Sequence, residues 1–74
     1  MNWDLVERNW NQFKGTVRAR WGRFDDANLE AIGGKRAALL GQIQAIYGVK
    51  RSDAEKEIKI FEARNKDYRP KNRD

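Results

Sequence analysis

The chain has 74 residues, no cysteine, no histidine and a net charge of +5, a length that suits one domain and excludes two. Without Cys or His there is no disulfide, thiolate nucleophile or imidazole base, and the carboxylates are scattered, so we expect no enzyme, no metal, no cofactor and no small-molecule substrate. No charge-free stretch approaches a membrane span and the first residues lack a signal-peptide pattern, so we expect a cytoplasmic protein with no membrane contact.

The first expected helix covers residues 2–21 and ends at Gly22. Large apolar side chains recur along it at steps of three and four, which places them on one face: Trp3, Val6, Trp10, Phe13, Val17 and Trp21. The three tryptophans could form a platform on which nucleic-acid bases stack. The same face also carries aliphatic side chains that a small domain must bury, so we interpret it as core.

Two further helices are expected in the middle of the chain. Asp25 or Asp26 can cap a short one, and Gly33-Gly34 interrupts it, because each glycine costs about 1 kcal/mol inside a helix. The next helix runs from about residue 35 to residue 48. The apolar side chains expected to face the core are Leu29 and Ile32 in the short helix, then Leu39, Ile43 and Tyr47, flanked by Leu40 and Ile46.

The last expected helix begins at Ser52-Asp53-Ala54-Glu55, which matches a capping box. Its inward side chains are predicted to be Ala54, Ile58 and Phe61. We expect residues 1–64 to form a single helical domain and residues 65–74 to be a basic, flexible tail. No stretch alternates apolar and polar residues long enough for a strand, so the predicted fold is an all-α bundle of about four helices.

Two stretches of the sequence resemble each other. When residues 13–22 are laid on residues 39–48, Gly15, Ala19 and Gly22 coincide with Gly41, Ala45 and Gly48. This internal repeat predicts two crossed helical hairpins related by a pseudo-twofold axis, with Gly15 and Gly41 at close helix crossings. Chance similarity between two amphipathic helices that end in glycine is the alternative.

Residues 2–62 also resemble a known family. The matching residues are Glu7, Trp10, Lys14-Gly15, Val17 and Trp21-Gly22, then Leu29, Ile32, Gly34-Lys35, Leu39, Gly41, Ile43 and Tyr47-Gly48. Together they resemble the CsbD-like family of small bacterial stress-response proteins, which includes the YjbJ type. The resemblance implies a helical bundle, cytoplasmic accumulation under stress and no assigned activity.

The positive charge is concentrated in residues 8–23 and in the tail. It indicates either a solvated surface or a phosphate-binding one. Gly33-Gly34 partly matches a helix-hairpin-helix turn, which binds a DNA phosphate, although the usual turn separates its glycines.

Two functions therefore stay open. One is a non-enzymatic stress protein, monomer or weak dimer, that acts by abundance or through an unknown protein partner. The other is a nucleic-acid-binding module with Arg8, Lys14, Arg18, Lys35 and Arg36 as its binding residues.

Overall fold

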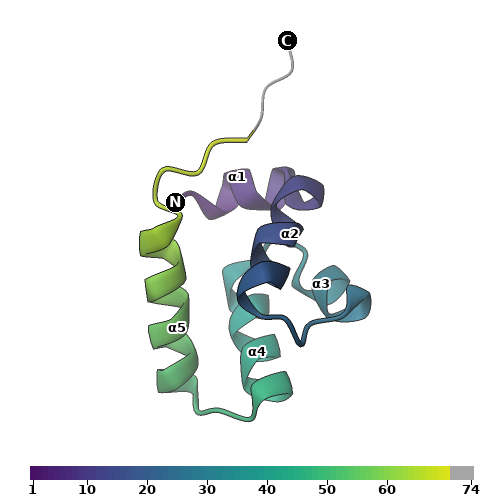
Figure 1. Ribbon diagram of the computed structural model, residues 1–74, viewed down its shortest axis with the longest axis vertical. Helices are drawn as coiled ribbons and strands as arrows, with labels where there is room; N and C mark the ends of the chain where they lie inside the picture. The colour runs from purple at the N-terminus through teal and green to yellow at the C-terminus, as the bar shows by residue number, and fades with distance from the viewer. Residues whose placement is uncertain (71–74) are drawn as a thin grey trace.

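The computed structural model describes residues 1–70 and contains five helices. They are α1 (Trp3–Arg8), α2 (Trp10–Arg20), α3 (Asp26–Ile32), α4 (Arg36–Tyr47) and α5 (Arg51–Arg64). Residues 1–70 contain no strand, so the all-helical prediction is confirmed. Figure 1 shows α4 and α5 side by side, with α1 across the end of this pair near the last turn of α5.

The single helix expected over residues 2–21 is wrong, because the structure breaks it at Asn9 into α1 and α2. Asn9 has φ −118° and ψ 36°, and its side-chain amide donates to the Leu5 carbonyl at 2.9 Å. Asn favours helix ends because its side chain can replace a backbone partner in this way. The break turns α1 toward Gly34, where a Cβ would lie only 2.6 Å from the Cα of Glu7.

The predicted apolar stripe supplies much of the core. Val6, Phe13, Val17 and Trp21 are buried, while Trp3 and Trp10 are partly buried against them. Phe61 of α5 packs on the stripe, with ring centroids 4.9 Å from Trp21 and 5.8 Å from Phe13. The inward residues predicted for the later helices are also buried, apart from the partly buried Ile46 and Tyr47: Leu29, Ile32, Leu39, Leu40, Ile43, Ala54, Ile58 and Phe61.

Phe24 belongs to the core although it is outside the predicted apolar stripes. It lies between α2 and α3, is 1% exposed, and its ring centroid is 6.2 Å from that of Trp21 and 6.0 Å from that of Tyr47. Helical periodicity cannot identify such a residue, because it sits in a loop.

The helix ends agree with the sequence in part. Asp25 caps α3 and forms a reciprocal capping box with Asn28. Gly33 ends α3 and Gly48 ends α4, both with left-handed backbone angles. The capping box expected at Ser52 is wrong, because α5 already begins at Arg51 and its N-cap residue makes no side-chain cap.

Gly15 and Gly41 do not mark close helix crossings. A Cβ added at either position would have no neighbour within 4 Å. The close approach is instead at Gly34, outside the repeated segment. α3 packs on α4 and α4 on α5, while the pseudo-twofold arrangement of two crossed hairpins stays a prediction.

Residues beyond α5 also contact the helices. Tyr68 lies with its ring centroid 4.6 Å from that of Phe13, and the amino group of Met1 donates to the Lys66 carbonyl at 3.3 Å. The boundary expected after residue 64 stays a prediction, and residues 71–74 of the expected tail lie outside the described residues.

Candidate anion-binding surface

Arg36, one of the five predicted binding residues, is held between two carboxylates of α5. Its Nε donates to Glu62 at 2.8 Å, and its two terminal nitrogens donate to Glu55 at 3.2 and 2.9 Å. The hydrogen bonds that Arg36 donates to Glu55, and then those to Glu62, raise the pKa of Arg36 above its usual value. The guanidinium fork is therefore used to join α4 to α5.

Lys35 and Arg18 also face carboxylates, in more exposed positions. The Lys35 ammonium lies 2.7 Å from Glu7, which links the start of α4 to α1. Arg18 lies 3.7 Å from Asp26, and both side chains are largely exposed. Exposed pairs of this kind contribute about 0–1 kcal/mol, so an anionic partner can displace them at little cost.

Arg8 and Lys14 form no ion pair with any residue in the range 1–70. Arg8 is exposed and Lys14 is half-buried. Arg8 also borders a depression of about 350 Å³ at the break between α1 and α2, which residues 7–12 line. The structure thus distributes the five predicted residues over the α1–α2 break, the outer side of α2 and the start of α4.

The three tryptophans are used by the fold. The indole of Trp3 donates to Glu62 at 2.8 Å, that of Trp21 to Glu57 at 3.0 Å, and that of Trp10 to the Leu29 carbonyl at 3.0 Å. A Trp N–H that leaves water needs such a partner. These contacts and the burial of the rings support the interpretation of the tryptophans as core.

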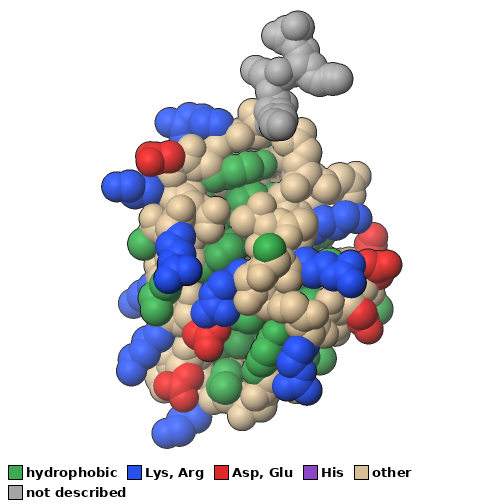
Figure 2. Space-filling model, viewed as in Figure 1, with side chains coloured by type: hydrophobic (Ala, Val, Ile, Leu, Met, Phe, Trp, Pro, Cys, Tyr) green, Lys and Arg blue, Asp and Glu red, His purple; other side chains and the backbone are tan. Residues whose placement is uncertain are grey.

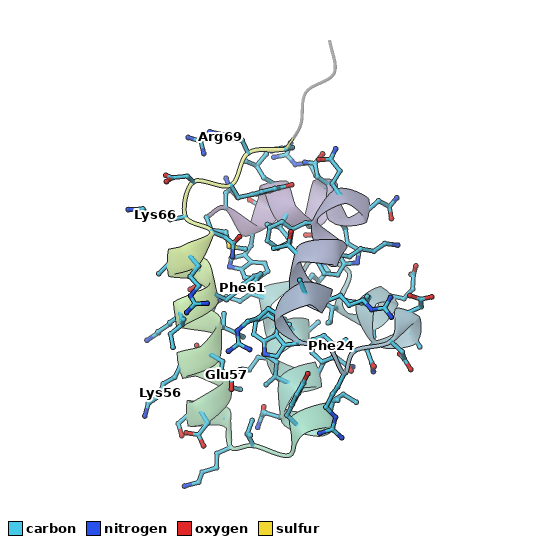
Figure 3. The ribbon with its side chains drawn as sticks, viewed as in Figure 1. Phe24, Lys56, Glu57, Phe61, Lys66 and Arg69 are labelled. Atoms are coloured by element: carbon cyan, nitrogen blue, oxygen red, sulfur yellow. The ribbon has the colours of Figure 1, made fainter. Side chains whose placement is uncertain are left out.

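The acidic and basic side chains of α5 lie on different sides of the helix, an arrangement that the sequence pattern did not predict. Its glutamates lie on the inner flanks, where Glu57 accepts from Arg20 and Trp21 and Glu62 accepts from Arg36 and Trp3. Its four basic side chains, Arg51, Lys56, Lys59 and Arg64, are exposed. Figure 3 shows Glu57 on the side of α5 toward α2 and Lys56 on the opposite side.

The paired glutamates are stabilised in their ionised form. Hydrogen bonds from Arg36 lower the pKa of Glu55 below its usual value. Partial burial by itself raises the pKa of Glu62, but the hydrogen bonds from Arg36 and Trp3 outweigh it, so that this pKa is also lowered. At neutral pH both carboxylates are charged and neutralise the cation that α4 presents to them.

Across residues 1–70 no cluster of three or more carboxylates is placed to hold a metal ion. Within the same residues, no helix combines the length and the apolar character that crossing a membrane requires.

Similar proteins are found in several bacteria. UPF0337 protein YjbJ of Escherichia coli K12 is 46% identical over 69 residues, which are 93% of this chain and 99% of that protein. UPF0337 protein ECA0631 of Pectobacterium atrosepticum is 46% identical over 66 residues, 89% of this chain and 96% of its own length. UPF0337 protein NE2439 of Nitrosomonas europaea is 43% identical over 61 residues, which are 82% of this chain and 65% of that protein. No family model and no solved structure matches the chain. The identity over nearly the whole length of YjbJ shows that the chain belongs to the UPF0337 family.

Proposed function

We propose that this protein is a non-enzymatic cytoplasmic protein of the CsbD-like stress response that acts by binding, and that its binding partner is an anionic macromolecule. The stress role rests on the resemblance of residues 2–62 to the CsbD-like family. The anionic partner rests on the way the fold distributes charge.

One observation carries this proposal. The fold pairs four of its five glutamates with basic residues of the same chain: Glu7 with Lys35, Glu57 with Arg20, and both Glu55 and Glu62 with Arg36. The chain nevertheless has 16 Lys and Arg against 11 Asp and Glu. The basic surplus therefore lies outside these pairs, on the surface, where it favours polyanions and is sensitive to salt.

Fluorescence anisotropy of labelled duplex and single-stranded DNA, titrated with the protein at about 50 and about 200 mM salt, tests this function. Binding in the micromolar range that weakens steeply with salt is expected, because each released counterion adds about −0.9 to the log–log slope on duplex DNA. No binding at the lower salt concentration would contradict an anionic partner. The stress protein would then act by abundance or by binding a protein without using its basic surface.

A further inference from the structure

The outer face of α5 forms a continuous basic surface. Lys56, Lys59 and Arg64 are exposed there, and none of them lies within 4 Å of a carboxylate in the described part of the chain. At 1.5 Å of rise per residue, the three cations span about 12 Å along the helix. Lys66 and Arg69 extend the surface past the end of α5, as Figure 3 shows.

Few acidic side chains interrupt this surface. Between residues 55 and 66 the acids are Glu55, Glu57 and Glu62. All three accept hydrogen bonds from Arg or Trp side chains of other helices, and Glu55 also lies near enough to Lys59 for their charges to interact. Asp53 and Asp67 lie near its two ends. Figure 2 shows Lys and Arg side chains spaced along the edge of the molecule that α5 forms. A partner that fits this surface carries negative charge repeated along its length.

An apolar side chain lies among these cations. Ile60 is 50% exposed and is the only large hydrophobic residue of the range 1–70 that is exposed. It sits four residues from both Lys56 and Arg64, so the three side chains neighbour one another on the helix. Such a mixed surface can contact phosphates with its cations and sugar or base-edge carbon atoms with its apolar residue.

Two features favour a duplex over a single strand. Single-strand binders stack bases on exposed aromatic rings, whereas the tryptophans here are turned to the core and hydrogen-bonded within the protein. A helix about 10–12 Å across fits the major groove of B-DNA, which is about 12 Å wide.

We infer that the outer face of α5, with Lys56, Lys59, Ile60 and Arg64 at its centre, binds double-stranded DNA mainly through its phosphates. This inference rests on the proposed function and assigns the binding to α5 rather than to α1 and α2.

Two variants of equal charge test the assignment. The first combines Lys56→Gln, Lys59→Gln and Arg64→Gln on α5. The matched control combines Arg8→Gln, Lys14→Gln and Arg18→Gln on α1 and α2. Duplex DNA is titrated with each variant and with the unmodified protein by anisotropy over a range of salt concentrations. Far-UV circular dichroism establishes that each variant keeps its helices.

The α5 variant is expected to bind at least about tenfold more weakly at about 50 mM salt, with a log–log slope reduced by about 2.7, or 0.9 for each lost phosphate contact. The control is expected to lose less than about threefold. If the α5 variant loses helix content, the single change Lys56→Gln serves instead, with an expected slope reduction of about 0.9.

The failures can be distinguished. If the unmodified protein does not bind duplex DNA, the proposed function fails and this inference fails with it. If the protein binds but the control loses more affinity than the α5 variant, or both lose the same, DNA binding stands and the assignment to α5 is wrong.

A second experiment replaces the DNA with vesicles of anionic lipid. Tighter binding to these vesicles than to DNA, lost in the α5 variant, would overturn the choice of DNA as the partner.

Discussion

The region of α1 and α2 and the region of α5 carry charge in contrasting ways. Residues 8–23 contain five basic residues and no acidic one, whereas residues 51–70 contain six basic and five acidic ones and look nearly neutral. In the fold, Arg18 and Arg20 of the first region lie near carboxylates. The glutamates of α5 are drawn inward by arginines of other helices, and its outer face is left basic. A local count of charged residues therefore does not locate a charged surface, because basic and acidic side chains pair across helices.

The two regions are also attached to the rest of the fold differently. α1 depends on a close backbone approach between Glu7 and Gly34. α5 depends on its buried apolar residues together with the carboxylates that receive Arg20, Arg36, Trp3 and Trp21. Substitutions that weaken only one of these attachments therefore measure how much each contributes to the free energy of unfolding.

The largest effect is expected for Gly34→Ala, which acts on the attachment of α1. The new Cβ would lie 2.6 Å from the Cα of Glu7, and the backbone φ of 85° is unfavourable for any side chain. We expect the free energy of unfolding to fall by about 2–4 kcal/mol, measured by urea denaturation. The control is Gly33→Ala, where φ is also positive but the new Cβ would make an ordinary contact at 3.6 Å, with an expected loss of about 1 kcal/mol. Equal losses would show that the close approach is unimportant.

A smaller loss is expected for Glu62→Gln, which acts on the attachment of α5. The substitution keeps the size of the side chain but removes the charge that faces Arg36 and weakens the contact with the Trp3 indole. Because the group is partly exposed, we expect a loss of about 1–2 kcal/mol in urea denaturation. Glu30→Gln, at an exposed position without an ion pair in residues 1–70, should change stability by less than about 0.5 kcal/mol. If the Glu62→Gln protein is as stable as the control, the ion pair between Glu62 and Arg36 does not contribute to the attachment of α5.

Gly15→Ala in α2 and Gly41→Ala in α4 are expected to stabilise the protein. Both glycines are within helices, neither has a positive φ, and a Cβ at either position would meet nothing within 4 Å. Each substitution should add about 0.5–1 kcal/mol to the free energy of unfolding. Thermal denaturation checks this as a rise in Tm. A fall in Tm at either position would mean that the helix face there is covered by another part of the molecule.

A gradual loss of stability is expected on acidification. The pKa values of Glu55 and Glu62 are lowered in the folded state, so their contribution is present above the unfolded pKa of about 4.5 and is lost as the pH falls through the lower folded values. Urea denaturation from neutral pH to about pH 3 should show stability decreasing mainly below pH 4.5. The Glu62→Gln protein should show a shallower decrease over the same range. Parallel curves for the two proteins would exclude Glu62 as a contributor.

The sequence predicted which residues are buried better than where the first helix ends. Val6, Phe13 and Val17 were placed correctly because helical periodicity depends only on local spacing. The helix predicted over residues 2–21 ends early at Asn9, whose side chain donates locally to the Leu5 carbonyl, and α1 then lies against Gly34, a contact between residues distant in sequence. Glu55 was assigned to a capping box, yet it binds Arg36 of another helix.

The candidate site was predicted less well than the fold. Arg36 was selected as a binding residue because it follows a glycine turn, but the structure pairs it with two carboxylates. Lys56 and Lys59 are not among the predicted binding residues, because the local sequence mixes them with Glu55 and Glu57. The nearest signal is the helical position of Lys56, which lies on the side of α5 away from the buried Ala54.

The helical class, the apolar stripes, a cap at Asp25 or Asp26 and the glycine ends of α3 and α4 follow from the sequence, because each depends on a few neighbouring residues. Only the packing of the helices set the close approach at Gly34, the burial of Phe24 and the partners of the α5 glutamates. These depend on which helices meet. A carboxylate and a guanidinium 26 residues apart, such as Glu62 and Arg36, neutralise each other only after folding brings them to 2.8 Å, and the charges left over then define the outer surface.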